Sequence, residues 1–384
     1  MKYGCPLLLN ALVIRPDGEI TPCCLFTDFE NRPADLNVSH EDYFNHPYLQ
    51  TLRKNCKNDQ PHVGCTRCYD QEKVVGESYR TEAWTYQDEY GAVSLRDKKE
   101  SYLSYVDVHF SNLCNNKCRM CNPNLSTQWY ADAKKLVELD IQNHRHFSIP
   151  LPNGIIKNNL IDNGDFSKVK CIKFVGGEPL LEQDKMISLI EKCNISELSI
   201  ELITNATTIP NVYLTDLLKK CKTVTVILSV DSYGKMNDFL RKGSNWNVTK
   251  EVIEWFTKNF DRNVIRSIAS IYNINIVDKL MDYCSTLNNI YHGYHMLNGP
   301  DYMTIRNLPL KAKKKVAKRI KKWAKTDNYR KYNYETFFNL VLNEMQHEGD
   351  IEKFHYMDSL MNKIRNEHWR KINPELYKWI SSGS

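Results

Sequence analysis

The segment Phe110-Ser-Asn-Leu-Cys-Asn-Asn-Lys-Cys-Arg-Met-Cys-Asn122 places Cys114, Cys118 and Cys121 on one short loop. Their spacing is Cys-x3-Cys-x2-Cys. Three thiolates can bind three irons of a cubane cluster and leave the fourth iron open to a small molecule. The pattern therefore favours redox chemistry at an open iron over structural bracing.

Further segments follow the cysteine loop in a fixed order. They are Phe174-Val-Gly-Gly-Glu-Pro179, Leu202-Ile-Thr-Asn-Ala206, Val224-Thr-Val-Ile-Leu-Ser-Val-Asp231 and Asp238-Phe-Leu-Arg-Lys-Gly243. The first three come at or after apolar runs, which predict strands that end in polar groups. With the cysteine loop, this order resembles the radical S-adenosylmethionine (SAM) enzymes.

The resemblance implies which residues bind the cofactors. Cys114, Cys118 and Cys121 would hold a 4Fe-4S cluster. Contacts to SAM would come from Met120, Gly176, Gly177, Glu178, Pro179, Thr204, Asn205, Ser229, Asp231 and Arg241. The glycines allow close backbone approach to a ligand, and Glu178 would accept a charge-assisted hydrogen bond from the methionyl ammonium. Arg241 resembles the arginine that meets the SAM carboxylate.

Two positions depart from the family pattern. Ala206 replaces the glycine that follows the Thr-Asn pair, and Met120 stands where many relatives have an aromatic residue near adenine. A methionine can pack against a ring through its polarizable sulfur. We therefore expect SAM binding to be affected only mildly by Met120.

Alternation of apolar runs with helical segments predicts an α/β fold with a parallel sheet. We expect strands over 105–110, 169–175, 197–203, 223–230, 264–271 and 290–297. Six such units resemble the partial (β/α)6 barrel, a TIM-like radical SAM core. In the first strand Asp107 and His109 share a face that should point into the barrel. They are candidate catalytic residues, as substrate contacts or proton carriers, with structural hydrogen bonding as the alternative.

A second cysteine group lies near the N-terminus. Cys5-x12-Gly18-x4-Cys23, followed by Cys65-x2-Cys68, resembles the twitch domain, a short relative of the SPASM domain. The resemblance implies that these four cysteines hold an auxiliary 4Fe-4S cluster, and a zinc site is the alternative. The roles of Cys24 and Cys56 stay open.

The sequence predicts four regions. They are a twitch-like domain at 1–75, a connector at 76–103, the radical SAM core at 104–300 and a helical C-terminal region at 301–384. Arg15-Pro-Asp-Gly-Glu19 should form a hairpin turn between two short strands of the first region. The span 144–168 is an expected insertion.

Composition narrows the setting of the protein. The sequence has no apolar run of membrane-spanning length, and we expect a cytoplasmic protein. In that compartment its thirteen cysteines favour metal binding or catalysis over disulfides. A basic segment, 311–325, contributes much of the net charge of +6 and should form an amphipathic helix. Its basic face is either simply solvated or meets an anionic partner such as nucleic acid or an acidic peptide.

The resemblance also implies an activity. A reductant such as flavodoxin or ferredoxin would deliver one electron, SAM would be cleaved to a 5′-deoxyadenosyl radical, and that radical would take hydrogen from a substrate. We expect net oxidation or modification of a peptide or a small alcohol or sugar. The alternatives are a radical SAM enzyme that acts on RNA and a non-catalytic iron–sulfur or zinc protein.

Overall fold

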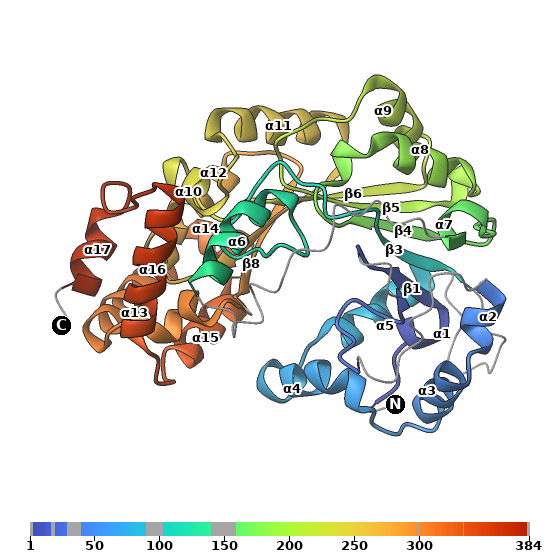
Figure 1. Ribbon diagram of the computed structural model, residues 1–384, viewed down its shortest axis with the longest axis horizontal. Helices are drawn as coiled ribbons and strands as arrows, with labels where there is room; N and C mark the ends of the chain where they lie inside the picture. Colours follow the sequence, from blue (N-terminus) through green and yellow to red (C-terminus); the bar gives the residue numbers. More distant parts are fainter. Residues whose placement is uncertain are drawn as a thin grey trace. The chain divides into compact units, whose positions relative to one another are not determined.

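The computed structural model (Figure 1) describes residues 3–16, 20–28, 40–89, 103–139, 159–297, 299–332 and 334–381. Eight strands form one sheet in the order β2-β1-β3-β4-β5-β6-β7-β8. The sheet is mostly parallel and does not close, so β2 and β8 form its edges. This arrangement confirms the predicted α/β class and is consistent with a partial barrel.

The six expected barrel strands are all present, with ends within two residues of the prediction. The strands are β1 Ala11–Ile14, β2 Ile20–Thr21, β3 Tyr105–His109, β4 Cys171–Val175, β5 Ser199–Thr204, β6 Thr223–Ser229, β7 Arg262–Ala269 and β8 Ile290–Met296. Their apolar runs are rich in Val and Ile, which favour the extended backbone of a strand.

The N-terminal hairpin extends the barrel sheet. β1 pairs antiparallel with β2, as Ile14 opposite Ile20 shows, and parallel with β3, where Val13 lies opposite Asp107. The central turn residues 17–19 lie outside the described part of the chain. The first region of the sequence therefore adds two strands to the six of the expected core.

Helices follow the strands and fill the C-terminal region. They are α1 Leu7–Asn10, α2 His40–Asn45, α3 Pro47–Lys57, α4 Thr66–Val75, α5 Tyr79–Glu89, α6 Tyr130–Glu138, α7 Asn159–Asn163, α8 Gln183–Glu191, α9 Val212–Lys219, α10 Lys235–Leu240, α11 Trp246–Asn259, α12 Val277–Ser285, α13 Leu310–Trp323, α14 Asp327–Lys331, α15 Glu335–Glu344, α16 Ile351–Arg365 and α17 Pro374–Ser381. The helical C-terminal region is confirmed. The expected connector begins with α5, and most of the expected insertion lies outside the described residues. No helix in the described ranges is long and apolar enough to cross a membrane.

The chain divides into two compact units. The first comprises residues 1–113, 151–203 and 210–225, and the second comprises 114–150, 204–209 and 226–384. In the first unit, Val106, Val108 and Phe174 are completely or almost completely buried, as are Met186 and Ile190 of α8. The apolar faces of β3 and β4 thus face the core, which leaves their polar side chains on the opposite face.

Candidate radical SAM site

The cysteine loop belongs to the second unit. Cys114 and Cys118 are buried and Cys121 is half-buried. The Asn116 amide donates to Cys114 Sγ at 3.4 Å, and the side-chain amide of Asn205 lies 3.8 Å from the same sulfur. Burial raises the pKa of Cys118 to about 11, Arg241 opposes the rise, and Cys114 adds to it. The loop therefore gathers sulfur atoms in a protected setting that a cation or cluster would favour.

The segment 240–243 runs along the cysteine loop and holds its backbone. Lys242 O accepts the Lys117 N–H and Leu240 O accepts the Arg119 N–H, each at 2.7 Å. Gly243 has a φ of +110°, and a Cβ there would lie 2.5 Å from the carbonyl oxygen of Asn115. Only glycine combines this left-handed backbone with such close approach.

Arg241 and Asp231 form a buried ion pair in the same unit. Arg241 Nη1 donates to Asp231 Oδ2 at 2.8 Å, while the Ile268 N–H donates to Asp231 Oδ1 at 2.9 Å. Burial lowers the pKa of Arg241, but Cys118 and Asp231 outweigh it, so the net pKa is raised and the guanidinium stays charged. Arg241 Nε is buried without a hydrogen-bond partner among the described residues.

Other predicted SAM contacts lie at the ends of β5 and β6 or on the cysteine loop. Thr204 is buried, and its hydroxyl accepts the Ala206 N–H at 3.3 Å. Ala206 adopts a φ of +58°, the left-handed backbone that the family glycine would adopt at lower cost. Asn205 links this turn to the loop through Asn115 Oδ1 at 2.7 Å. Ser229 and Met120 are half-buried.

The Gly-Gly-Glu-Pro segment lies at the end of β4 in the first unit. A Cβ on Gly177 would lie 2.1 Å from Leu113 O, and Gly176 has a φ of +120° beside Ser111 O. The Glu178 N–H donates to Leu113 O at 2.8 Å, and Glu178 Oε1 accepts the Leu180 N–H at 3.2 Å. The glycines thus bring the segment against the chain that leads into the cysteine loop. Pro179, the last residue of the segment, is buried.

Asp107 and His109 share one face of β3, as predicted. His109 Nε2 lies 3.4 Å from Asp107 Oδ1, and Lys173 Nζ of β4 lies 3.6 Å from Asp107 Oδ2. Burial raises the pKa of Asp107, but Lys173 and His109 outweigh it and hold the net pKa below its usual value. His109 Nδ1 is buried and has no hydrogen-bond partner among the described residues. An ionised Asp107 thus orients an imidazole whose second nitrogen is unpaired.

The N-terminal cysteines lie in the first unit. Burial is the main cause that raises the pKa of Cys5, Cys23 and Cys65. Cys65 raises the pKa of both Cys5 and Cys23, and Cys68 raises that of Cys65. The Cys5 N–H also donates to Cys56 Sγ at 3.1 Å, so Cys56 belongs to this group. Cys68 has its pKa raised by burial and is hydrogen-bonded to Ser78 and Arg80.

Cys24 faces a different environment from that of the other N-terminal cysteines. Burial raises its pKa, and the charged groups that act on it most are Lys173 and Asp107 on the polar face of the sheet. Cys24 nevertheless remains close enough to Cys23 to raise its pKa, so it differs from Cys56 in its charged neighbours and not in its distance from the group.

All thirteen cysteines are free thiols. No group of three or more His, Cys, Asp or Glu side chains within the described ranges is arranged to hold a metal ion. The ligand assignments therefore depend on the chemistry of the thiols and on the sequence pattern. For the cysteine loop this fit is reinforced by the orphaned Nε of Arg241 and the unpartnered side chain of Asn116, both buried.

Comparison with known proteins identifies the central domain. Residues 108–284 match the Radical SAM superfamily. The matched span is somewhat less than half of the chain, and it includes the cysteine loop and the strand ends described above. No curated protein matches the chain.

Several solved structures are similar to parts of the chain. A structure of anSMEcpe with bound AdoMet is 19% identical over 65% of this chain and 63% of that one, with a TM-score of 0.41. Streptococcus suis SuiB bound to S-adenosylmethionine is 14% identical over 68% of this chain and 58% of its own, with a TM-score of 0.36. TYW1 with a lysine-pyruvate adduct is 15% identical over 74% and 90% of the two chains, with a TM-score of 0.33. The chain thus spans less than two thirds of the first two proteins.

Sequence reasoning missed several residues in the two units. Arg119 lies between two predicted ligands but belongs to no recognised motif, and its partners come about 240 residues later in the chain. Lys173 could have been found, because it occupies a polar position within the apolar run of β4. Nothing in the sequence marked Asn116 as a site residue except its position within the cysteine loop.

Proposed function

We propose that the protein is a radical SAM enzyme in which Cys114, Cys118 and Cys121 bind a 4Fe-4S cluster. The observation that carries the proposal is the buried cysteine loop with Arg241 beside it, whose Nε lacks an acceptor. When bound, the cluster and SAM would supply a 5′-deoxyadenosyl radical for hydrogen abstraction from a substrate. The remaining SAM contacts would come from the Gly-Gly-Glu-Pro segment and the ends of β5 and β6.

The chain's own contribution to substrate chemistry would be made by Asp107 and His109. His109 Nδ1 is buried and has no hydrogen-bond partner among the described residues, and Asp107 Oδ1 lies 3.4 Å from the opposite nitrogen. In an oxidation, the substrate loses a hydrogen atom, a proton and an electron. We assign the proton to His109 Nδ1, with the imidazolium stabilised by Asp107. A substrate that presents a hydroxyl or amine N–H to this nitrogen fits the site.

Net oxidation also needs an electron acceptor. We assign this role to an auxiliary 4Fe-4S cluster on the N-terminal cysteines, Cys5, Cys23, Cys65 and Cys68, in a twitch-like domain at 1–75, with structural zinc as the alternative. The substrate would be a peptide or a small alcohol or sugar. A flavodoxin or ferredoxin would supply the reducing electron, and free thiols suit the reducing cytoplasm.

Analysis of anaerobically reconstituted protein tests this proposal. About eight irons per chain would establish two clusters, whereas about four irons with bound zinc would leave the N-terminal site structural. Formation of 5′-deoxyadenosine after addition of dithionite and SAM would establish the radical chemistry. Its absence, with and without candidate substrates, would favour a non-catalytic protein.

Helix α13 favours a second candidate, action on RNA. It carries eight basic and no acidic side chains between Leu310 and Trp323. However, Trp379 beside it is buried and covered by Lys315 Nζ at 5.0 Å, so its ring is not free to stack on a base. Tight RNA binding that weakens steeply with salt would support this candidate.

A further inference from the structure

The C-terminal end of α16 lies against the cysteine loop within the second unit. Arg119 on that loop is fully buried, and its Nη2 donates to Glu367 Oε2 at 3.0 Å and to Asn362 Oδ1. Asp358 Oδ1 lies 3.7 Å from Nη1 of the same guanidinium. A buried arginine needs such partners, because an unpaired charge in the interior is costly.

Glu367 joins two segments of the site. One oxygen binds Arg119, and the other lies 2.9 Å from Lys242 Nζ. Lys242 belongs to the segment whose carbonyl oxygens accept the Lys117 and Arg119 amides. A single carboxylate therefore ties the cysteine loop to the segment that carries Arg241.

Arg365 supplies a second attachment. Its Nε donates to Asp132 Oδ2 at 2.7 Å, and Asp132 Oδ1 accepts from Lys117 Nζ at 3.1 Å. The same guanidinium lies 4.4 Å from the ring centroid of Trp129, whose indole N–H donates to Cys118 O at 2.9 Å. The end of α16 thus reaches the loop at both Lys117 and Cys118.

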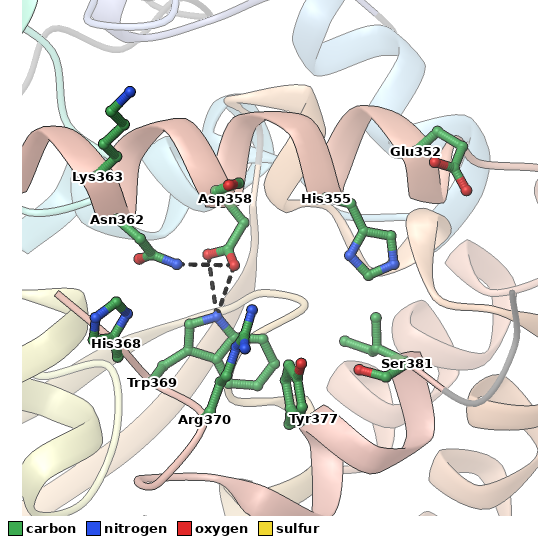
Figure 2. Close-up of a pocket in the computed structure, with 12 residues that line it drawn as sticks. Glu352, His355, Asp358, Asn362, Lys363, His368, Trp369, Arg370, Tyr377 and Ser381 are labelled. Atoms are coloured by element: carbon green, nitrogen blue, oxygen red, sulfur yellow. Dashed lines mark hydrogen bonds between the residues drawn. The ribbon is translucent and has the colours of Figure 1, made fainter.

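Local geometry fixes these side chains in place. Asn366 ends α16 with a φ of 51°, a left-handed cap after which the chain reaches Glu367. Figure 2 shows Asp358 and Asn362 of α16 pointing toward Trp369, beside a pocket of about 670 Å³. Asp358 accepts the Trp369 indole N–H at 3.0 Å and the Tyr272 hydroxyl at 2.7 Å. Asp358, which lies beside Arg119, is therefore held by two further donors.

We propose that α16 and Glu367 position the cysteine loop for cluster binding, and that Glu367 is the main positioning residue. Its two ion pairs, with the Arg365 attachment, restrict the motion of the backbone that carries Cys118 and Cys121. Only the measurement of iron release depends on the cluster assignment, because hydrogen exchange is measured on the protein without a cluster. The restraint on the loop exists in the protein without a cluster.

Hydrogen exchange of the full-length apo-protein tests the restraint. Glu367→Gln keeps the side-chain shape and removes the charge. Amides of 114–121 should exchange about tenfold faster in this variant, because loss of a buried ion pair loosens the loop. Amides of β7 in the same unit should be unchanged. The matched control is Glu344→Gln, which removes the exposed pair between Glu344 and Arg306 and should leave the loop unaffected.

Iron release provides a second readout. Reconstituted Glu367→Gln should lose iron to a chelator about tenfold faster than the wild type or Glu344→Gln, with an unchanged rate of global unfolding. Unaltered loop exchange in folded Glu367→Gln would overturn the proposal, as would equal acceleration in the loop and in β7. If Glu367→Gln does not fold, Lys242→Met removes one of its two pairs and should accelerate exchange in the loop. If no cluster forms in any variant, the proposed function fails while the exchange result still decides this inference.

Discussion

Arg241 donates a 2.8 Å hydrogen bond to Asp231 from a buried guanidinium whose Nε has no partner in the described part of the chain. The pair joins the end of β6 to the segment that holds the cysteine loop. Asp231 is itself fixed by the Ile268 N–H. The geometry therefore presents one rigid, charged donor group beside the predicted cluster ligands.

Arg241→Lys should weaken SAM binding about tenfold, because lysine keeps the charge but loses the planar donor set. Equilibrium binding of SAM to reconstituted protein measures the change. Arg262→Gln, which removes an exposed arginine of β7, is the control and should bind SAM normally. Wild-type affinity in folded Arg241→Lys would remove Arg241 from the SAM site.

Gly177→Ala should destabilise the protein by about 3 kcal/mol, because the new methyl group would overlap the carbonyl of Leu113. Gly293→Ala is a matched control, since its Cβ would meet only the Tyr291 ring at 3.5 Å. Denaturant unfolding of both variants measures the difference. Equal stability of the two would mean that the Gly-Gly segment does not pack as described.

Because of His292, the free energy of unfolding should depend on pH. It is buried between Ser267 and Tyr334, and burial lowers its pKa from 6.5 to about 3. Below about pH 6.5 the unfolded chain therefore binds a proton at His292 more readily than the folded chain does. The free energy of unfolding then falls as the pH drops below about 6.5. By linkage, the loss should reach about 2 kcal/mol at about pH 5.

The check on His292 is the pH dependence of unfolding in His292→Gln. This variant should lose most of the decline between about pH 7 and about pH 5, whereas His347→Gln, at an exposed position, should retain it. An unchanged slope in His292→Gln would assign the decline to other groups.

Substitution of N-terminal cysteines should distinguish those that bind the auxiliary cluster from those that do not. The double variant Cys65→Ala/Cys68→Ala should halve the iron content, from about eight to about four per chain. Cys56→Ala should also lower it, because Cys56 Sγ accepts the Cys5 N–H at 3.1 Å. Cys24→Ala should leave the iron content unchanged, since the charged groups that act most on Cys24 are Lys173 and Asp107. Loss of iron in Cys24→Ala, with normal iron content in Cys56→Ala, would contradict this assignment.

The sequence predicted the barrel strands well because their apolar alternation is local. Val106, Val108, Asp107 and His109 lie on the faces that period two assigns to them. The parallel pairing of β1 with β3 could not be predicted, since it joins positions such as Ala11 and Tyr105 that are far apart in the chain.

The sequence did not predict contacts between site residues that lie far apart in the chain. Arg119 contacts Glu367 across 248 positions, and no spacing rule links them. The glycine pair was identified, but its packing on Leu113 became visible only in the fold. The mutual ion pair of Asp231 and Arg241 likewise required the turn between β6 and α10.

The most direct test of the radical SAM assignment compares two sets of cysteine variants. Reconstituted, dithionite-reduced wild-type protein should convert SAM to 5′-deoxyadenosine, and so should Cys193→Ala/Cys221→Ala, which changes two cysteines outside the site. The triple variant Cys114→Ala/Cys118→Ala/Cys121→Ala should form none. Continued 5′-deoxyadenosine formation by the triple variant would contradict the assignment of the cysteine loop as the cluster site.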